Sequence, residues 1–232
     1  MADRRDRFEV RIDASPEEVW RCLTTSDGLA SWFGTGANID TRVGGARVVE
    51  WGDAMNIVAK VTDLETNRRI RLAYLNGDEE VGAEEWLIET EGTTTRLTLI
   101  HSMSDQDIDD WDGFYGDVRR GWRLFMASLR YALESAESVT RTAECRYVPA
   151  PDRTQTWNRL QELLAEGPGT LAGLSPIISD PPHSLLLTAS DRTLMVDLEG
   201  SGANQVLFIQ AATHGAPDEW RSEAIETVVA GI

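Results

Sequence analysis

The sequence predicts an α+β fold in which a curved antiparallel sheet holds a long helix on its concave side. Three observations predict it. Several segments alternate apolar and polar residues with the period of two that is typical of half-buried strands. Two short helical segments precede most of these strands, and one long helix with an apolar stripe follows them. The chain has 232 residues and 41% apolar composition, which is enough to bury a core of this kind.

The first strand and helix are predicted in the segment RFEVRIDASPEEVW, residues 7–20. Its first half alternates apolar and charged residues, as a half-buried strand does. Ser15 can then cap a helix, and Pro16 suits the first helical position. The stretch TTSDG ends this helix, and LASWFG forms a second short one. We therefore expect Trp20 and Trp32 to anchor a V-shaped pair of helices on the sheet.

A run of strand-like segments follows the second short helix. A double glycine precedes ARVVEW, and MNIVAKVTDLE and RRIRLAYL alternate over several positions. AEEWLIETE and TRLTLIHSM flank the turn EGTTT, which is typical of a β-hairpin. A long helix is predicted from about Gly113 to Glu137, and its apolar stripe consists of Phe114, Val118, Trp122, Phe125, Leu129 and Leu133. Because a curved sheet needs its concave side filled, we expect the helix to lie there.

Four segments, taken in order, carry a family resemblance: FEVRIDASPEEVWRCLTTSDGLASWF, the GG before ARVVEW, EEWLIETEGTTTRLTLIHSM, and GWRLFMASLRYALE. They resemble the SRPBCC or START-like superfamily, in its branch of activators of a heat-shock chaperone ATPase. The resemblance covers residues 7–137 and implies a helix-grip (START-like) fold whose members often hold a cavity. It implies no particular activity, because these families share a scaffold and differ in what the cavity holds.

Residues 138–232 are predicted to form a smaller α+β domain, so that the helix-grip domain spans residues 1–137. TAECRYVPAPDRTQTWNRLQELLAE has the pattern of a strand, a proline and a helix, and a Gly/Pro-rich connector follows it. Three further strand-like segments precede a closing helix. This order is a shortened version of the first domain. The segment is therefore interpreted either as a degenerate second copy of the fold or as an unrelated α+β cap.

The composition argues against several classes of function. A formal net charge of −17 repels phosphate backbones and anionic membranes, so neither nucleic acid nor a membrane is an expected partner. Two cysteines and three histidines form no zinc motif, and we predict no cofactor and no metal. The Asp-rich run SDQDIDDWDG fails the EF-hand spacing and is interpreted as the charged start of the long helix. Without a signal peptide or a membrane-length apolar run, a cytoplasmic location is expected.

Aromatic side chains are the most informative candidates for a site. Rings on the elements around a helix-grip cavity can line a pocket for an apolar or aromatic ligand, or they can simply fill a core. The predicted pocket residues are Phe33, Trp51, Trp86, His101, Phe114 and Trp122.

His101 is a weak candidate for catalysis. It has the parity of Leu97 and Leu99, which directs it toward the concave face, where an imidazole can act as a general acid or base. Glu84 has the parity of Trp86 and could face inward near His101. Because it lies near a predicted strand start, exposure to solvent is the simpler interpretation.

Three functions follow from these patterns. The preferred one is non-enzymatic binding of a small apolar or aromatic molecule in the cavity, because no nucleophile with a base and no metal motif is visible. The second is an enzyme of cyclase, dehydratase or hydrolase type that acts in the same cavity. The third, which the family branch implies, is a chaperone-associated protein-interaction module. A homodimer is compatible with each of them.

Overall fold

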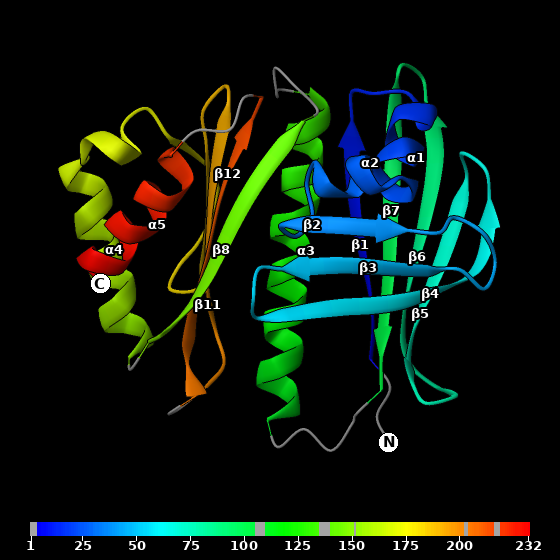
Figure 1. Cartoon of the computed structure of the whole chain (residues 1–232), viewed down its shortest axis with the longest axis horizontal. Coiled ribbons are helices and arrows are strands. Elements are labelled where there is room, and N and C mark those ends of the chain that lie inside the picture. Colours follow the sequence, from blue (N-terminus) through cyan, green and yellow to red (C-terminus); the bar gives the residue numbers. More distant parts are fainter. Residues whose placement is uncertain (1–3, 105–109, 135–139, 151, 202–203, 216–218) are drawn as a thin grey trace. The chain divides into compact units, whose positions relative to one another are not determined.

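The computed structural model describes residues 4–104, 110–134, 140–150, 152–201, 204–215 and 219–232. The chain divides into two compact units. The first consists of Met1–Trp111 and Phe125–Ser135, and the second of Asp112–Leu124 and Ala136–Ile232. Each unit contains one antiparallel sheet (Figure 1). The predicted α+β class, with a curved antiparallel sheet, a long helix after its strands and a smaller α+β part, is confirmed.

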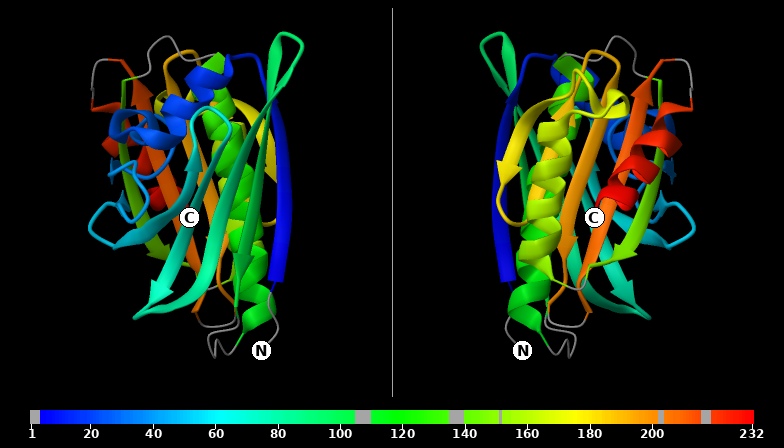
Figure 2. Two further views of the ribbon diagram at one scale, coloured as in Figure 1. Left: turned by 90° about the vertical axis from the view of Figure 1, so that its right-hand side faces the viewer. Right: turned by 90° about the vertical axis from the view of Figure 1, so that its left-hand side faces the viewer.

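Seven strands of the first unit form one sheet in the order β1-β7-β6-β5-β4-β3-β2. Each of β3 to β7 pairs with the strand before it, and β1 pairs with β7, as the left view of Figure 2 shows. The elements are β1 (Arg4–Ile12), α1 (Pro16–Thr24), α2 (Ser26–Ala30), β2 (Gly36–Ile39), β3 (Ala46–Trp51), β4 (Met55–Glu65), β5 (Arg69–Asn76), β6 (Glu79–Glu91), β7 (Thr94–Met103) and α3 (Trp111–Glu134). The helix α3 contributes residues to both units.

Local hydrogen bonds fix the two short helices. The Ser15 hydroxyl accepts from the backbone N–H of Glu18, whose carboxylate accepts in return from the N–H of Ser15 at 2.9 Å. This reciprocal pair is a capping box. The buried face of α1 differs from the prediction, because Trp20 is only half-buried while Cys22 is buried. Trp32 is buried as expected, and its indole N–H donates to the carbonyl of Cys22 at 3.0 Å.

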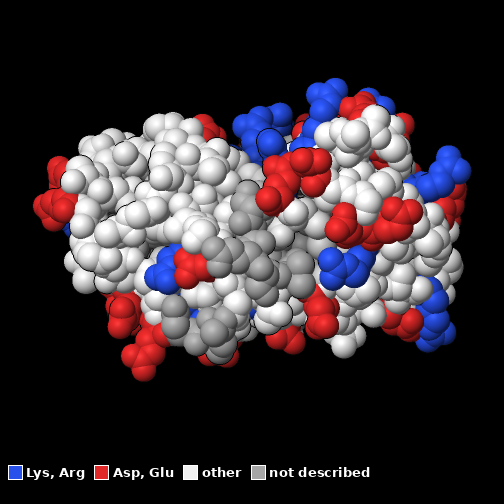
Figure 3. All heavy atoms as spheres, turned by 90° about the horizontal axis from the view of Figure 1, so that it is seen from above, with Lys and Arg blue, Asp and Glu red and all other residues white. Residues whose placement is uncertain are grey.

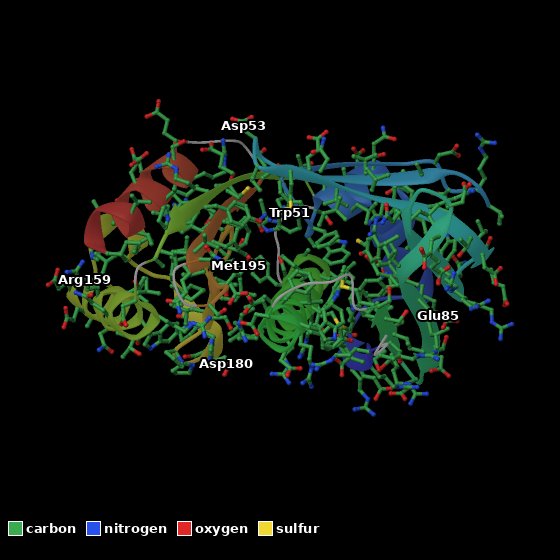
Figure 4. All side chains as sticks on the ribbon, turned by 90° about the horizontal axis from the view of Figure 1, so that it is seen from below. Trp51, Asp53, Glu85, Arg159, Asp180 and Met195 are labelled. Carbon is green, nitrogen blue, oxygen red and sulfur yellow. The ribbon has the colours of Figure 1, made fainter. Side chains whose placement is uncertain are left out.

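One face of the first sheet, here called the inner face, carries the apolar core. Directly opposite residues of neighbouring strands point to the same side of a sheet. One such row crosses four strands and consists of Phe8, Leu99, Trp86 and Ile70. Glu85, the neighbour of Trp86 along β6, points to the other face and pairs with Arg69 at 2.8 Å (Figure 4).

Five strands of the second unit form a sheet in the order β8-β12-β11-β10-β9. The elements are β8 (Arg141–Pro149), α4 (Arg153–Glu166), the 3₁₀ turn η1 (Gly169–Leu171), β9 (Ser175–Asp180), β10 (Ser184–Thr188), β11 (Arg192–Glu199), β12 (Val206–His214) and α5 (Trp220–Gly231). The sequence did not predict β9, which lies within the Gly/Pro-rich connector. Because β9 is an edge strand with three exposed residues at its start, it can contain a proline and lacks apolar alternation.

Helices α4 and α5 both cover one face of the second sheet, as the right view of Figure 2 shows. Their buried residues include Trp157, Leu160 and Ile225, which pack with Leu194 and Val196 of β11. Alternate β11 residues therefore face this core, while Met195 and Asp197 point to the opposite side.

Charged side chains of both signs lie next to one another on the face of the protein drawn in Figure 3.

The helix α3 begins at Trp111, two residues before the predicted start, and residues 105–109 of the Asp-rich run and residues 135–137 lie outside the described residues. None of the helices in the described ranges is both long and apolar enough to cross a membrane.

Candidate functional site

Three charged or titratable side chains interrupt the apolar inner face of the first sheet in a single row. Asp6 of β1 lies opposite His101 of β7, and His101 lies opposite Glu84 of β6. Glu84 is 0% exposed and His101 is 3% exposed. The expectation that Glu84 is exposed to solvent is wrong. It assumed that a strand starts near Glu84, but β6 begins five residues earlier, at Glu79. The parity argument that brought Glu84 near His101 agrees with this register.

Glu84 is the acceptor of a buried polar network, defined here as Arg47, Tyr74, Glu84 and Trp86. Arg47 donates twice, from Nη1 to Oε2 and from Nη2 to Oε1, each at 2.6 Å. The Tyr74 hydroxyl donates to Oε1, and the Trp86 indole N–H donates to Oε2 at 3.0 Å. Each carboxylate oxygen therefore accepts two hydrogen bonds, which satisfies the acceptor capacity of the group.

The Arg47–Glu84 contact depends on the curvature of the sheet. Arg47 lies on β3 and Glu84 on β6, with β4 and β5 between them. Neighbouring strands are about 4.8 Å apart, so these backbones would be roughly 14 Å apart in a flat sheet. A concave face shortens the path between the side chains. Ala59, which is opposite Arg47 on β4, is small enough to leave room for the arginine side chain.

Burial and charge act against each other in this network. Burial, the largest single cause, would lower the pKa of the Arg47 guanidinium and raise that of Glu84. Their mutual attraction and the hydrogen bonds of the network together outweigh it, so the pKa of Arg47 is raised and that of Glu84 is lowered. Both groups are therefore ionised. Burial of its hydroxyl, and then the charge of Glu84, raise the pKa of Tyr74 well above its ordinary value. Burial also lowers the pKa of His101 below 6.5, so its imidazole is neutral at neutral pH.

An aromatic cluster adjoins the polar network. It consists of Trp32, Phe33, Trp51 and Phe125, with ring centroids of contacting pairs between 4.8 and 5.3 Å apart. Trp51, labelled in Figure 4, lies at the end of β3, and Phe125 lies on the part of α3 that belongs to the first unit.

Two contacts join the aromatic cluster to the polar network. The Trp86 ring meets Trp32 edge-on at 6.0 Å. The guanidinium carbon of Arg47 lies 5.8 Å from the centroid of the Phe33 ring, within the range of a cation–π contact. Apolar rings and a few convergent polar groups therefore occupy the same part of the inner face, which is the composition of small-molecule sites.

The structure brings together four of the six predicted pocket residues: Phe33, Trp51, Trp86 and His101. The other two, Phe114 and Trp122, lie on the Asp112–Leu124 part of α3, which belongs to the second unit. Trp122 is buried and Phe114 is half-buried. That these six residues line a ligand pocket stays a prediction.

Sequence reasoning missed Arg47. Its signal was present, because Arg47 shares parity with the buried residues Val49 and Trp51 on β3. An arginine on an apolar face must find a counter-charge, but the sequence pattern does not identify a partner 37 residues away.

The Nε–H of Arg47 is a further feature of the site. This atom is buried and has no hydrogen-bond partner within the described part of the chain. In the same residues, no group of three or more His, Cys, Asp or Glu side chains is placed to hold a metal ion.

A second buried charged cluster lies in the second unit. Asp197 of β11 is 1% exposed, and its Oδ1 lies 3.8 Å from Nε of Arg120. Arg120 also pairs with Asp117, which accepts from the backbone N–H of Gly200 at 2.7 Å. Burial, and then the charge of Glu199, raise the pKa of Asp197 to about 8. Burial and the charge of Asp117 raise the pKa of Glu199 to about 7.

Comparison with known proteins gave one family match. The model of the family described as "Activator of Hsp90 ATPase homolog 1-like protein" matches residues 13–134, more than half of the chain. No curated protein matches the sequence.

Several solved structures are similar to part of the chain. The structure of the Aha1 dimer from Colwellia psychrerythraea is 26% identical, with a TM-score of 0.49, over 58% of this chain and 97% of that one. A conserved protein of unknown function from Enterococcus faecalis is 19% identical, with a TM-score of 0.49, over 60% of this chain and 75% of that one. A protein from Mesorhizobium loti is 20% identical, with a TM-score of 0.47, over 55% and 94%.

Proposed function

Because the chain belongs to the Activator of Hsp90 ATPase homolog 1-like family, we propose that its first unit binds a small apolar or aromatic molecule at the inner face of the sheet. Membership of this family suggests a ligand-binding or a chaperone-associated module. The single observation that favours ligand binding is the aromatic cluster beside a fully buried ion pair. A homodimer and a cytoplasmic location stay predictions.

The energetics of the ion pair support the proposal. Removing two charges from water costs several kcal/mol for each ion, and a well-packed apolar pair of similar volume is often as stable or more stable. Stability alone therefore does not account for a buried Arg47 and Glu84 on a mainly apolar face. Polar groups that fix the orientation of a bound ligand do account for them.

The test is a titration with N-phenyl-1-naphthylamine, a neutral aromatic probe, followed by quenching of tryptophan fluorescence. We expect saturable binding that Phe33→Leu weakens by about five- to tenfold, because the substitution removes a large ring from the aromatic cluster. Phe208→Leu is the matched control, since Phe208 is also buried in a ring pair, with Tyr147 of the second unit at 5.0 Å. Phe208→Leu should leave the affinity unchanged.

Two results would lead to other conclusions. Absence of saturable binding to the wild-type protein would contradict the proposal, and equal weakening by both substitutions would place the probe outside the inner face.

An enzyme is the second candidate, because the neutral imidazole of His101 lies opposite Glu84. Chemical conversion of a bound aromatic compound that His101→Gln abolishes, with an unchanged melting temperature, would assign that function instead.

A further inference from the structure

Arg47 has one donor that none of the described residues accepts from. Its Nη1 and Nη2 both donate to Glu84, while the buried Nε–H has no hydrogen-bond partner in the described residues. The side chain is 2% exposed. A buried donor without an acceptor costs free energy, and a ligand oxygen that accepts from it recovers that cost.

The charges around this donor are already balanced. Glu84 neutralises Arg47 through two hydrogen bonds, from Nη1 and from Nη2. An anionic ligand would therefore meet the Glu84 carboxylate beside a guanidinium whose charge is already compensated, and would lose its hydration in exchange. A cationic ligand would meet the guanidinium. The site is suited to an uncharged hydrogen-bond acceptor.

The rings around Phe33 indicate which kind of group lies next to the hydrogen-bond acceptor in the ligand. Its ring lies 5.8 Å from the guanidinium carbon of Arg47, 5.3 Å from Trp51 and 5.0 Å from Phe125. An aromatic body packed among these rings is therefore adjacent to the arginine. A substituent one or two bonds from such a body is close to the Nε–H.

We propose that the first unit recognises uncharged aromatic carbonyl compounds, whose carbonyl oxygen accepts a hydrogen bond from Nε–H of Arg47. This inference rests on the proposed function, because it names the chemical class of the ligand for the same site. It adds a specificity-determining role for Arg47: the arginine selects a neutral acceptor and rejects both the hydrocarbon and the carboxylate of the same shape.

Three probes of nearly equal shape test this selection. They are 2-acetylnaphthalene, its alkene analogue 2-isopropenylnaphthalene, and the carboxylate 2-naphthoate. Affinities are measured by tryptophan quenching with the full-length protein. We expect 2-acetylnaphthalene to bind about tenfold more tightly than either of the others, because only the ketone pairs with the buried donor without bringing a charge.

Arg47→Lys is the informative variant. Lysine keeps a positive charge opposite Glu84 but has no Nε–H donor at this position of the side chain. We expect it to bind the ketone and the alkene with nearly equal affinity. Tyr74→Phe is the control, since it removes a hydrogen bond to Glu84 and a long one from Nη2 of Arg47 at 3.5 Å, while the Nε–H of Arg47 stays in place. It should keep the preference for the ketone.

A measurement on the wild-type protein keeps the inference testable if Arg47→Lys does not fold. The infrared carbonyl band of bound 2-acetylnaphthalene should lie at lower wavenumber than in hexane, as a hydrogen bond from a guanidinium requires. Equal affinity for ketone and alkene, tightest binding of 2-naphthoate, or an unshifted carbonyl band would each overturn the inference and leave the proposed function standing. Failure of all three probes to bind would overturn the proposed function itself.

Discussion

Glu84 and Asp197 are both buried carboxylates, and their surroundings give them opposite properties. Glu84 accepts four hydrogen bonds, two of them from an arginine, and its pKa is lowered. Asp197 has its closest arginine atom at 3.8 Å, beyond hydrogen-bond distance, and the pKa of its carboxyl is raised to about 8. Burial raises the pKa of a carboxyl unless direct hydrogen bonds and an opposite charge compensate.

The raised values predict that stability falls with rising pH. The pKa of Asp197 rises from 3.8 to about 8 and that of Glu199 from 4.5 to about 7 on folding. The folded state therefore holds these protons more tightly, and the stabilisation is complete below about pH 4 and lost as the pH rises through 7 and 8. His101 and His183 have lowered pKa values, so they titrate below pH 6.5 and do not affect the range from pH 7 to 9.

Between pH 7 and pH 9 we expect the free energy of unfolding to fall by about 1–2 kcal/mol. Urea denaturation at a series of pH values measures it. Asp197→Asn should remove most of the decrease, while Asp53→Asn, at an exposed position after β3, should leave it unchanged. A free energy that stays constant or rises over this range would show that the two carboxyls do not hold their protons in the folded protein.

At the scale of elements, the turn between α1 and α2 determines where the aromatic cluster begins. The Thr25 hydroxyl caps α2 by accepting from the N–H of Gly28 at 3.0 Å. A Cβ at Gly28 would lie 2.1 Å from the carbonyl oxygen of Arg21, so no side chain fits between the two helices. The close approach brings Trp32 and Phe33, which follow α2, to the inner face of the sheet.

Gly28→Ala should therefore destabilise the protein by about 1–3 kcal/mol, as overpacking does. It should also weaken binding of the aromatic probe, because Phe33 moves with α2. Gly169→Ala is the matched control, since a Cβ there meets nothing within 4 Å, and it should change stability by less than about 0.5 kcal/mol. Urea melts of both variants give the comparison. If Gly28→Ala is as stable as the wild type, the contact of α1 with α2 is looser than described.

The elements show which features local sequence can predict. Strand alternation and the Ser15–Glu18 cap depend on residues within one turn or one strand, and the corresponding strands and helix are present. The predicted apolar stripe of α1 consists of Val19, Trp20 and Leu23. Val19 and Leu23 are buried, whereas Trp20 is half-buried and Cys22 is buried, because the packing of the helix is not encoded in its own sequence. The edge strand β9 lacks alternation. The Arg47–Glu84 pair depends on sheet curvature across four strands, which no local pattern encodes.

At the scale of the whole molecule, the two units share one connectivity. In each, the first strand pairs with the last, the intervening strands pair in sequence order, and helices lie between the first and second strands and after the last. The second sheet has two strands fewer. This agreement supports the interpretation of residues 138–232 as a shortened copy of the first fold.

The second unit needs the first part of α3 as well as its own sheet. Asp117 accepts a hydrogen bond from the N–H of Gly200 at 2.7 Å, and Arg120 is the arginine closest to Asp197 in their ion pair. A fragment of residues 140–232 lacks both side chains. At pH 9, above the pKa of about 8 of Asp197, its buried carboxylate would then have no counter-charge from Arg120, and an uncompensated buried charge is strongly destabilising.

We therefore expect the fragment of residues 140–232 to be marginally stable and the fragment of residues 110–232 to be clearly more stable. Thermal melts followed by circular dichroism at pH 9, where Asp197 is ionised, compare them, and Arg120→Leu in the longer fragment tests whether the charge accounts for the difference. Arg120→Leu should lower the melting temperature toward that of the shorter fragment. Equal melting temperatures for the two fragments would mean that α3 contributes nothing to the second unit, and that the strands and helices after residue 140 complete its core without it.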